Sequence, residues 1–211
     1  MAGNLWTRIY DRRFHLVWMG WLLMLSVAGT ILTAKYWGEL GSARYDVMVL
    51  EVLIVSFFAA LYGYRLSYRA ARLANSFQHI AVQTRDGDLI QMFEEFRVVR
   101  RELQASNDKQ PLDTDTVEAA KPVKVGERKV RPADVIKKVF NYYEATAIGV
   151  KRHALDEQMI KSWWRKSYIL DWMDFAEYIR AKRKRDRLPR LFIEYESLVR
   201  RWATEEEQGL L

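Results

Sequence analysis

The sequence predicts an all-α protein in which a two-helix transmembrane hairpin is followed by a cytoplasmic helical domain, a small helix bundle. Three observations support this prediction. Two apolar stretches of about 20 residues lie close together near the N-terminus, at 14–34 and 47–66. The rest of the chain is strongly charged and carries apolar residues at helical spacing. No alternating strand pattern bounded by hairpin turns is found in the sequence.

Each apolar stretch is long enough to cross a bilayer, because about 20 residues at about 1.5 Å each give about 30 Å of helix. Glu51 is the only charged residue between positions 16 and 32 and between positions 47 and 64. The competing interpretation is a pair of buried helices in a soluble protein, but such helices seldom stay apolar over this length. The first stretch could also be a cleaved signal peptide. Its length and the second stretch that follows favour a signal anchor instead.

Basic residues beside the two stretches predict the orientation, because they resist translocation and stay on the cytoplasmic side. Three arginines precede the first stretch and three follow the second, whereas the turn between them has balanced charges. We therefore expect a multi-pass protein of the bacterial inner membrane with both termini in the cytoplasm. The predicted parts are a cytoplasmic N-terminus at 1–13, transmembrane helices at 14–34 and 47–66, a periplasmic turn at 35–46, cytoplasmic amphipathic helices at 67–104, a linker at 105–131 and a cytoplasmic helical bundle at 132–211.

Small residues recur at four-residue spacing in both predicted spans, which lets helix backbones approach closely in lipid. They are Ser26, Gly29, Thr30, Thr33, Ser56, Ala59, Ala60 and Gly63. These residues could pack the hairpin on itself or on another subunit. Glu51 lies about 6 Å inside the outer end of the second span, where it either reaches the headgroups or lines a path through the membrane. Since two spans cannot enclose a pore, such a path requires a homo-oligomer.

The cytoplasmic part is predicted to be helical, with one interruption and one linker. The second span should continue as a helix until 84–88 (TRDGD) breaks it, and Asp88 should then cap a helix that runs to about Leu103. Residues 105–131 include two prolines, one glycine and no aromatic residue, which predicts a linker or a mobile loop. Four apolar stripes then predict four amphipathic helices packed as a small bundle, at 135–143, 159–164, 169–179 and 191–202.

The sequence lacks the motifs of common active sites, so we expect no enzyme activity, no cofactor, no metal and no small-molecule substrate. It has no cysteine, which excludes disulfides and thiol chemistry. The three histidines, His15, His79 and His153, are too far apart in sequence to share a helix face as metal ligands. Arg72 and His79, with six residues between them, are similar to the R-x(4-6)-H element of HEPN ribonucleases, which are small helical proteins that cut RNA as dimers. This resemblance implies an alternative function as a ribonuclease.

Basic residues that could contact anionic headgroups or another anionic partner follow the second span and recur near the C-terminal end. They are Arg65, Arg69, Arg72, Arg180, Lys182, Arg183, Lys184, Arg185, Arg187 and Arg190. For the second group three interpretations compete: a solvated helix end, a patch for lipid headgroups, and a nucleic-acid contact. Tethering beside an anionic leaflet favours lipid or solvent. Trp163, Trp164 and Trp172 could stack on bases, but their helical spacing favours a place in the domain core.

A run of residues in the C-terminal half has the form N-[YF]-[YF]-E, A-x-G-[VI]-[KR], [LI]-D-E and a later W. The matching residues are Asn141, Tyr142, Tyr143, Glu144, Ala147, Gly149, Val150, Lys151, Leu155, Asp156, Glu157 and Trp164. This run resembles a family of bacterial domains of unknown function, often carried behind one or two membrane spans. The resemblance brings no catalytic residues with it.

With its two predicted spans and its length of 211 residues, the chain also resembles the two-transmembrane effector proteins of bacterial anti-phage defence systems, retrons in particular. That resemblance implies membrane permeabilisation and abortive infection, held in check by a reverse transcriptase and its DNA product. The partners implied are the bilayer, further copies of the chain, and a regulatory protein or nucleoprotein in the cytoplasm. The alternative is a membrane-anchored scaffold or interaction protein that conducts nothing.

Overall fold

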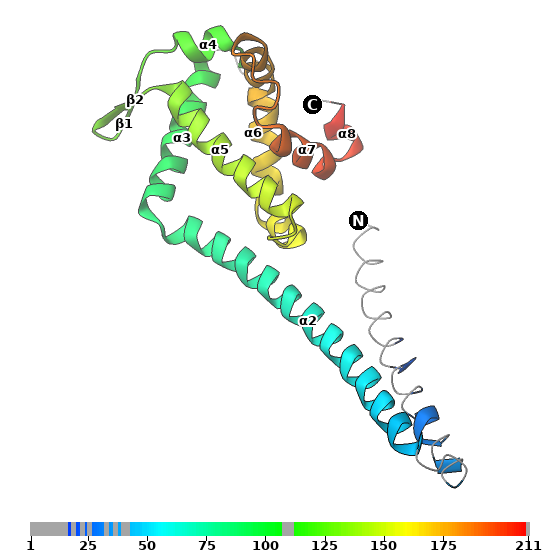
Figure 1. Ribbon diagram of the computed structural model, residues 1–211. Coiled ribbons are helices and arrows are strands. Elements are labelled where there is room, and N and C mark those ends of the chain that lie inside the picture. Colours follow the sequence, from blue (N-terminus) through cyan, green and yellow to red (C-terminus); the bar gives the residue numbers. More distant parts are fainter. Residues whose placement is uncertain are drawn as a thin grey trace. The chain divides into compact units, whose positions relative to one another are not determined.

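The computed structural model describes residues 17, 20, 21, 24, 27–31, 34, 35, 38, 43–106 and 112–209 (Figure 1). This part of the chain is mostly helical, as predicted, and divides into two compact units, Met1–Arg69 and Ala70–Leu211. Its elements are α2 (Ala43–Arg85), α3 (Gly87–Ser106), α4 (Thr114–Ala119), β1 (Val123–Val125), β2 (Arg128–Val130), α5 (Pro132–Lys151), α6 (Glu157–Arg185), α7 (Ile193–Trp202) and α8 (Glu205–Gln208).

Helix α2 contains the whole of the second predicted span. Among the described residues it is the one helix long and apolar enough to cross a membrane, and none of its most apolar 18-residue window is buried. The described residues within 14–34 are helical, but most of that range, including Ser26 and Thr33, lies outside the described residues. The structure therefore describes one helix of span length, and the two-span hairpin stays a prediction.

The predicted break at 84–88 is confirmed, because α2 ends at Arg85 and α3 begins at Gly87. The capping residue differs from the prediction. Asp86 accepts hydrogen bonds from the backbone N–H groups of Asp88 (2.9 Å) and Leu89 (3.1 Å). An N-cap side chain satisfies the donors two and three residues ahead, so Asp86 caps α3 and Asp88 lies within its first turn.

Residues 112–131 of the predicted linker are part of the second unit, which corrects that prediction. Leu112 is fully buried and Val117 is 1% exposed. The short helix α4 is capped by Asp113, whose side chain accepts from the Thr116 N–H at 2.7 Å. Strands β1 and β2 form an antiparallel hairpin whose turn contains Gly126 at φ 61°, a conformation that glycine adopts without strain. The expectation of no strands is therefore wrong here.

Leu112 joins the segment before α4 to the middle of α6 through its backbone. Its N–H donates to the carbonyl of Asp174 at 2.9 Å, and its carbonyl accepts from the N–H of Tyr178 at 3.0 Å. These two groups of α6 are four residues apart, the spacing at which a helix bonds them to each other. The N–H and carbonyl of Leu112 thus replace the hydrogen bond that would otherwise join Tyr178 to Asp174 within α6.

The core of the second unit is an aromatic cluster. The ring of Phe140 on α5 lies with centroid distances of 5.3–6.3 Å from five other rings: Phe96, Tyr143, Phe175, Phe192 and Tyr195. Such rings contribute to the core through apolar burial and edge-to-face contacts. The cluster joins α3, α5, α6 and the start of α7 into one body.

The four predicted stripes lie on three helices rather than four. The stripes 135–143 and 191–202 correspond to α5 and α7, whereas 159–164 and 169–179 both lie on α6, because neither glycine nor proline interrupts residues 157–185. Trp172 is fully buried, as predicted, and Trp164 is half-buried. Trp163 is 61% exposed, so its predicted place in the core is wrong.

Candidate functional site

In the first unit, the carboxylate of Glu51 lies against the first predicted span. A Cβ atom at Gly29 would come within 2.7 Å of Glu51 Cδ and Oε1, and the hydroxyl of Thr30 donates to Glu51 Oε1 at 3.5 Å. A side chain at position 29 would require the end of the Glu51 side chain to move, since a contact below about 3 Å is a steric clash. Three residues that the sequence singled out separately, Gly29, Thr30 and Glu51, are thus brought together.

The other small residues of the second predicted span form an exposed set. They are Ser56, Ala59, Ala60 and Gly63, and nothing lies within 4 Å of a Cβ built at Gly63. Within the described residues, these positions are open for another helix to approach. Arg65 and Arg69 follow them on the same helix.

In the second unit, Arg72 is held at the start of α6. Its Nη2 pairs with Asp156 Oδ2 at 2.8 Å, and Asp156 caps α6 by accepting from the N–H of Met159 at 3.0 Å. The buried Ser76 completes the link, because its hydroxyl donates to the Arg72 carbonyl and accepts from the Asp156 N–H. Arg72 therefore links the part of α2 that belongs to the second unit to the connection between α5 and α6.

His79 lies seven residues beyond Arg72 and packs on the side chains of α5 and α6. Its Nε2 lies 3.0 Å from the hydroxyl of Thr146. The imidazole stacks on Tyr142 with ring centroids 5.1 Å apart and meets the edge of Trp164 at 5.7 Å. Burial lowers the pKa of His79 below its ordinary value of 6.5. In this structure Arg72 forms an ion pair and His79 packs against other side chains, so both residues of the HEPN-like pair make contacts within the second unit.

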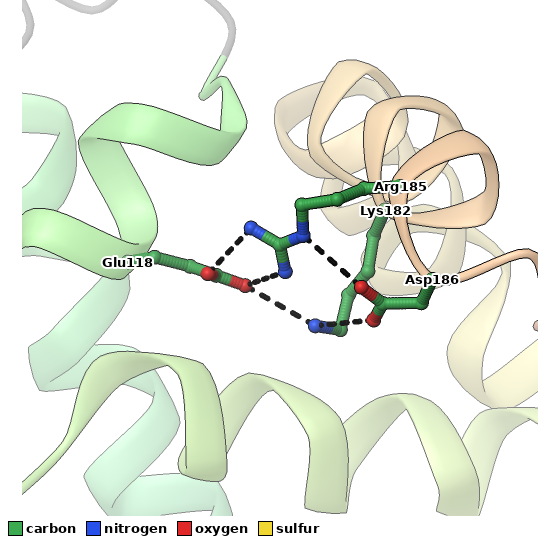
Figure 2. Close-up of polar contacts among 4 residues, drawn as sticks. All are labelled: Glu118, Lys182, Arg185 and Asp186. Atoms are coloured by element: carbon green, nitrogen blue, oxygen red, sulfur yellow. Dashed lines mark hydrogen bonds and ion pairs between the residues drawn. The ribbon is translucent and has the colours of Figure 1, made fainter.

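Three basic residues of the C-terminal run are used in contacts within the chain. Arg185 donates two hydrogen bonds, of 2.5 and 2.6 Å, to the Glu118 carboxylate on α4. Lys182 lies 3.1 Å from the same carboxylate and 2.9 Å from that of Asp186. Figure 2 shows these four side chains and the contacts between them. The hydrogen bonds from Arg185 are the main reason that the pKa of Glu118 lies below its usual value. Arg183 pairs with Glu196 at 2.6 Å.

The remaining basic side chains of this run are exposed: Arg180, Lys184, Arg187 and Arg190. The three residues bound to carboxylates, Lys182, Arg183 and Arg185, are accordingly the weakest candidates within the predicted anionic contact surface. A group already bound to a carboxylate has its charge neutralised locally and attracts a further anion less strongly.

The structure also reveals a buried charge network that sequence reasoning missed. Asp171 on α6 is 3% exposed; its carboxylate accepts from Arg100 Nη1 at 2.7 Å and from the Tyr143 hydroxyl at 2.8 Å. Arg100 also donates through Nε to Asp174 at 2.5 Å. Burial raises the pKa of Asp171 to about 6, against the opposing effects of the Arg100 charge and the Tyr143 hydrogen bond. The network joins α3, α5 and α6.

One sequence signal pointed toward this network. Asp171 lies inside the apolar stripe 169–179, between Ile169 and Trp172, and a charged residue on a buried face needs a partner. Its partner Arg100 is 71 residues away, and helical periodicity carries no information about a contact at that separation.

Comparison with known proteins assigns the chain to a family. Residues 50–202 match the family model DUF4760, a domain of unknown function. The chain belongs to the DUF4760 family. No curated protein and no solved structure matches the chain. The expected resemblance to a family of domains of unknown function is confirmed at this level.

The DUF4760 match extends well beyond the motif run on which the resemblance was based. It begins at residue 50 within the apolar part of α2 and ends at Trp202, the last residue of α7. Glu51, Arg72, His79 and Asp171 all lie inside it, whereas Gly29 and Thr30 lie outside. The DUF4760 region therefore includes the span-length helix as well as the folded unit.

The buried Asp171 and the half-buried His79 predict opposing effects of pH on the stability of the DUF4760 region. The folded-state pKa of Asp171, about 6, exceeds its ordinary value of 3.8. Its stabilising effect is therefore complete below pH 3.8 and is lost as pH rises through 6, by about 3 kcal/mol for about two pKa units. The folded-state pKa of His79 lies below 6.5, so its contribution is present above pH 6.5 and is lost on acidification.

We expect the thermal unfolding of two variants, Asp171→Asn and His79→Gln, to separate these effects. Between pH 4.5 and 7.5 the melting temperature of Asp171→Asn relative to wild type should rise with pH, and that of His79→Gln relative to wild type should fall with pH. Circular dichroism of the full chain in detergent measures both. A pH-independent difference for Asp171→Asn would contradict the raised pKa of Asp171.

Proposed function

We propose that this DUF4760 protein is a two-span inner-membrane effector without enzyme activity, with both termini in the cytoplasm. Its action is membrane permeabilisation, as the toxic arm of a bacterial anti-phage defence system. The observation that supports the membrane part is the exposed apolar length of α2. The side chains of Val52, Leu53 and Phe57 are 60–63% exposed, and apolar surface of this extent gains about 25 cal/mol per Å² when it leaves water.

The arrangement around α2 supports assembly in the bilayer. Glu51 is held against Gly29 and Thr30, so its polar group has a partner inside the predicted hairpin. The small residues from Ser56 to Gly63 are exposed, which leaves a face on which a second copy can pack closely. In the proposed mechanism, release from a cytoplasmic regulator lets hairpins associate through this face and open a path beside Glu51.

The test is membrane potential and propidium entry in bacteria that lack the native neighbouring genes, measured after induced expression. The wild type should depolarise the membrane within minutes and admit propidium. Phe57→Arg places a charge near the middle of the span, at a cost of about 2.5–3.5 kcal/mol for insertion, and should abolish depolarisation, as should deletion of residues 1–66. The matched control Phe57→Leu should behave like the wild type.

Two further variants test which residues line the path through the membrane and which residues mediate assembly. Glu51→Gln should reduce depolarisation if the carboxylate lines it, and Ala60→Leu should do so if the small-residue face mediates assembly. An inserted wild-type protein that leaves the potential intact would overturn the proposal and favour the scaffold. Arg72→Ala and His79→Ala test the ribonuclease alternative, since loss of toxicity with intact folding and unchanged depolarisation would favour RNA cleavage.

A further inference from the structure

The second unit contains a cleft of about 510 Å³ whose walls come from α2, α3, α5 and α6. Its volume lies within the range of about 300–1,000 Å³ that is usual for small-molecule sites. Its lining divides by burial into an inner end of the buried Phe93, Phe96 and Tyr143 and a mouth of the half-buried Gln83 and the exposed Arg97, Trp163, Lys166 and Leu170. The cleft lies wholly within residues 80–171 and is separate from the apolar part of α2.

The charged groups that line the inner end of the cleft are already paired with groups of the protein. Arg100 and Asp171 both line it, but they bind each other at 2.7 Å, and Arg100 also binds Asp174. Neither group is therefore left to neutralise a ligand. The apolar rings beside them favour an uncharged, planar part of a ligand at this end.

The mouth of the cleft combines a flat apolar surface with positive charge. Trp163 is 61% exposed and Leu170 is 40% exposed, although both belong to an otherwise well-packed helix. Arg97 and Lys166 are exposed and make no ion pair within the described part of the chain. Exposed tryptophan beside unpaired cations is the combination that binds a stacked ring carrying an anionic group.

One polar group in the cleft lacks a partner. Gln83 lines the cleft, and its Oε1 atom, which has almost no surface exposed to solvent, makes no hydrogen bond within the residues that the structure describes. An unpaired buried amide costs free energy that a bound partner recovers. A turn of the Gln83 side chain toward the cleft would let a ring amino or imino hydrogen supply that partner.

We propose that this cleft binds a nucleotide. The base stacks on Trp163 and donates a hydrogen bond to Gln83, and the phosphates lie at the mouth beside Arg97 and Lys166. The nucleotide is a bound ligand, and no reaction is assigned to it. This inference is independent of the proposed membrane activity.

The experiment is equilibrium dialysis of the full chain in detergent with radiolabelled ATP, in competition with adenosine, AMP and inorganic pyrophosphate. Trp163→Ala should weaken ATP binding at least tenfold. Arg97→Gln should weaken ATP binding about fivefold to tenfold and leave adenosine binding unchanged, because it removes only the contact to phosphate. The matched controls are Phe77→Ala, an exposed aromatic residue on α2, and Arg101→Gln on α3, which lie outside the cleft.

Each outcome is decisive once unfolding curves show that every variant is folded. ATP binding that is lost in Trp163→Ala and retained in Phe77→Ala supports the site. The absence of binding at millimolar ATP, GTP and AMP would overturn the proposal. Binding of pyrophosphate as tight as that of ATP, or equal ATP binding by all variants, would do so as well, because the ring contact would then contribute nothing.

Discussion

Replacing Arg100 with leucine is expected to lower the free energy of unfolding by about 3–5 kcal/mol at pH 8, because the substitution leaves the Asp171 carboxylate buried without its cation. The Tyr143 hydroxyl still donates to Asp171, but a single neutral donor does not replace the ion pair. Urea unfolding of the full chain in detergent, followed by near-ultraviolet circular dichroism, measures the loss. The loss should be smallest below pH 6, where Asp171 is protonated in both proteins, because removing the Arg100 charge raises the pKa of Asp171 further.

The control for this prediction is Arg101→Leu, the exposed neighbour on α3, which should change the free energy of unfolding by no more than about 0.5 kcal/mol. The double variant Arg100→Leu with Asp171→Leu should be more stable than Arg100→Leu alone, because it removes the unpaired charge. A double variant that loses the sum of the two single losses would show that the ion pair is not what couples the residues.

Shortening Leu112 to alanine is expected to destabilise the second unit by about 2–5 kcal/mol, since its side chain is fully buried. The substitution also loosens the backbone of residue 112, which is bonded to Asp174 and Tyr178. The amide of Tyr178 should therefore exchange its hydrogen faster than the amides of neighbouring residues on α6. Hydrogen exchange followed by mass spectrometry, together with urea unfolding, measures both effects.

The comparison for Leu112 is Leu188→Ala, which truncates a side chain that is 51% exposed and should have little effect on stability. If Leu112→Ala costs less than about 1 kcal/mol and leaves the exchange of the Tyr178 amide unchanged, the segment before α4 contributes little to the packing of α6.

Helical periodicity was sufficient to predict most elements of the second unit. The stripe that begins at Val135 and the one that ends at Trp202 correspond to helices, and the break after Arg85 follows from Asp86 and Gly87. Boundaries within α6 were harder to predict, because two stripes in different phase can lie on one uninterrupted helix. The β1–β2 hairpin was missed because strands of three residues give little alternation.

The contacts that define the candidate sites depend on residues distant in sequence, and periodicity carries no information about them. Arg72 and His79 stand out in the sequence as a pair, yet their partners Asp156 and Thr146 are 84 and 67 residues away. The same holds for the Gly29–Glu51 contact, where the small residue and the acid were each identified but not matched. Trp163 was misplaced since helical spacing alone does not distinguish a buried face from the wall of a cleft.

The backbone link at Leu112 has a consequence for the order in which the protein folds. Asp174 and Tyr178 follow Leu112 by 62 and 66 residues, so the two bonds close a long loop whose entropic cost is met only after α5 and α6 have come together. In a nascent helix the N–H of Tyr178 has the carbonyl of Asp174 as its local partner. Docking of Leu112 therefore replaces one local hydrogen bond that forms rapidly with two long-range hydrogen bonds that form slowly. We expect this turn of α6 to be among the last parts of the helix to reach its final form.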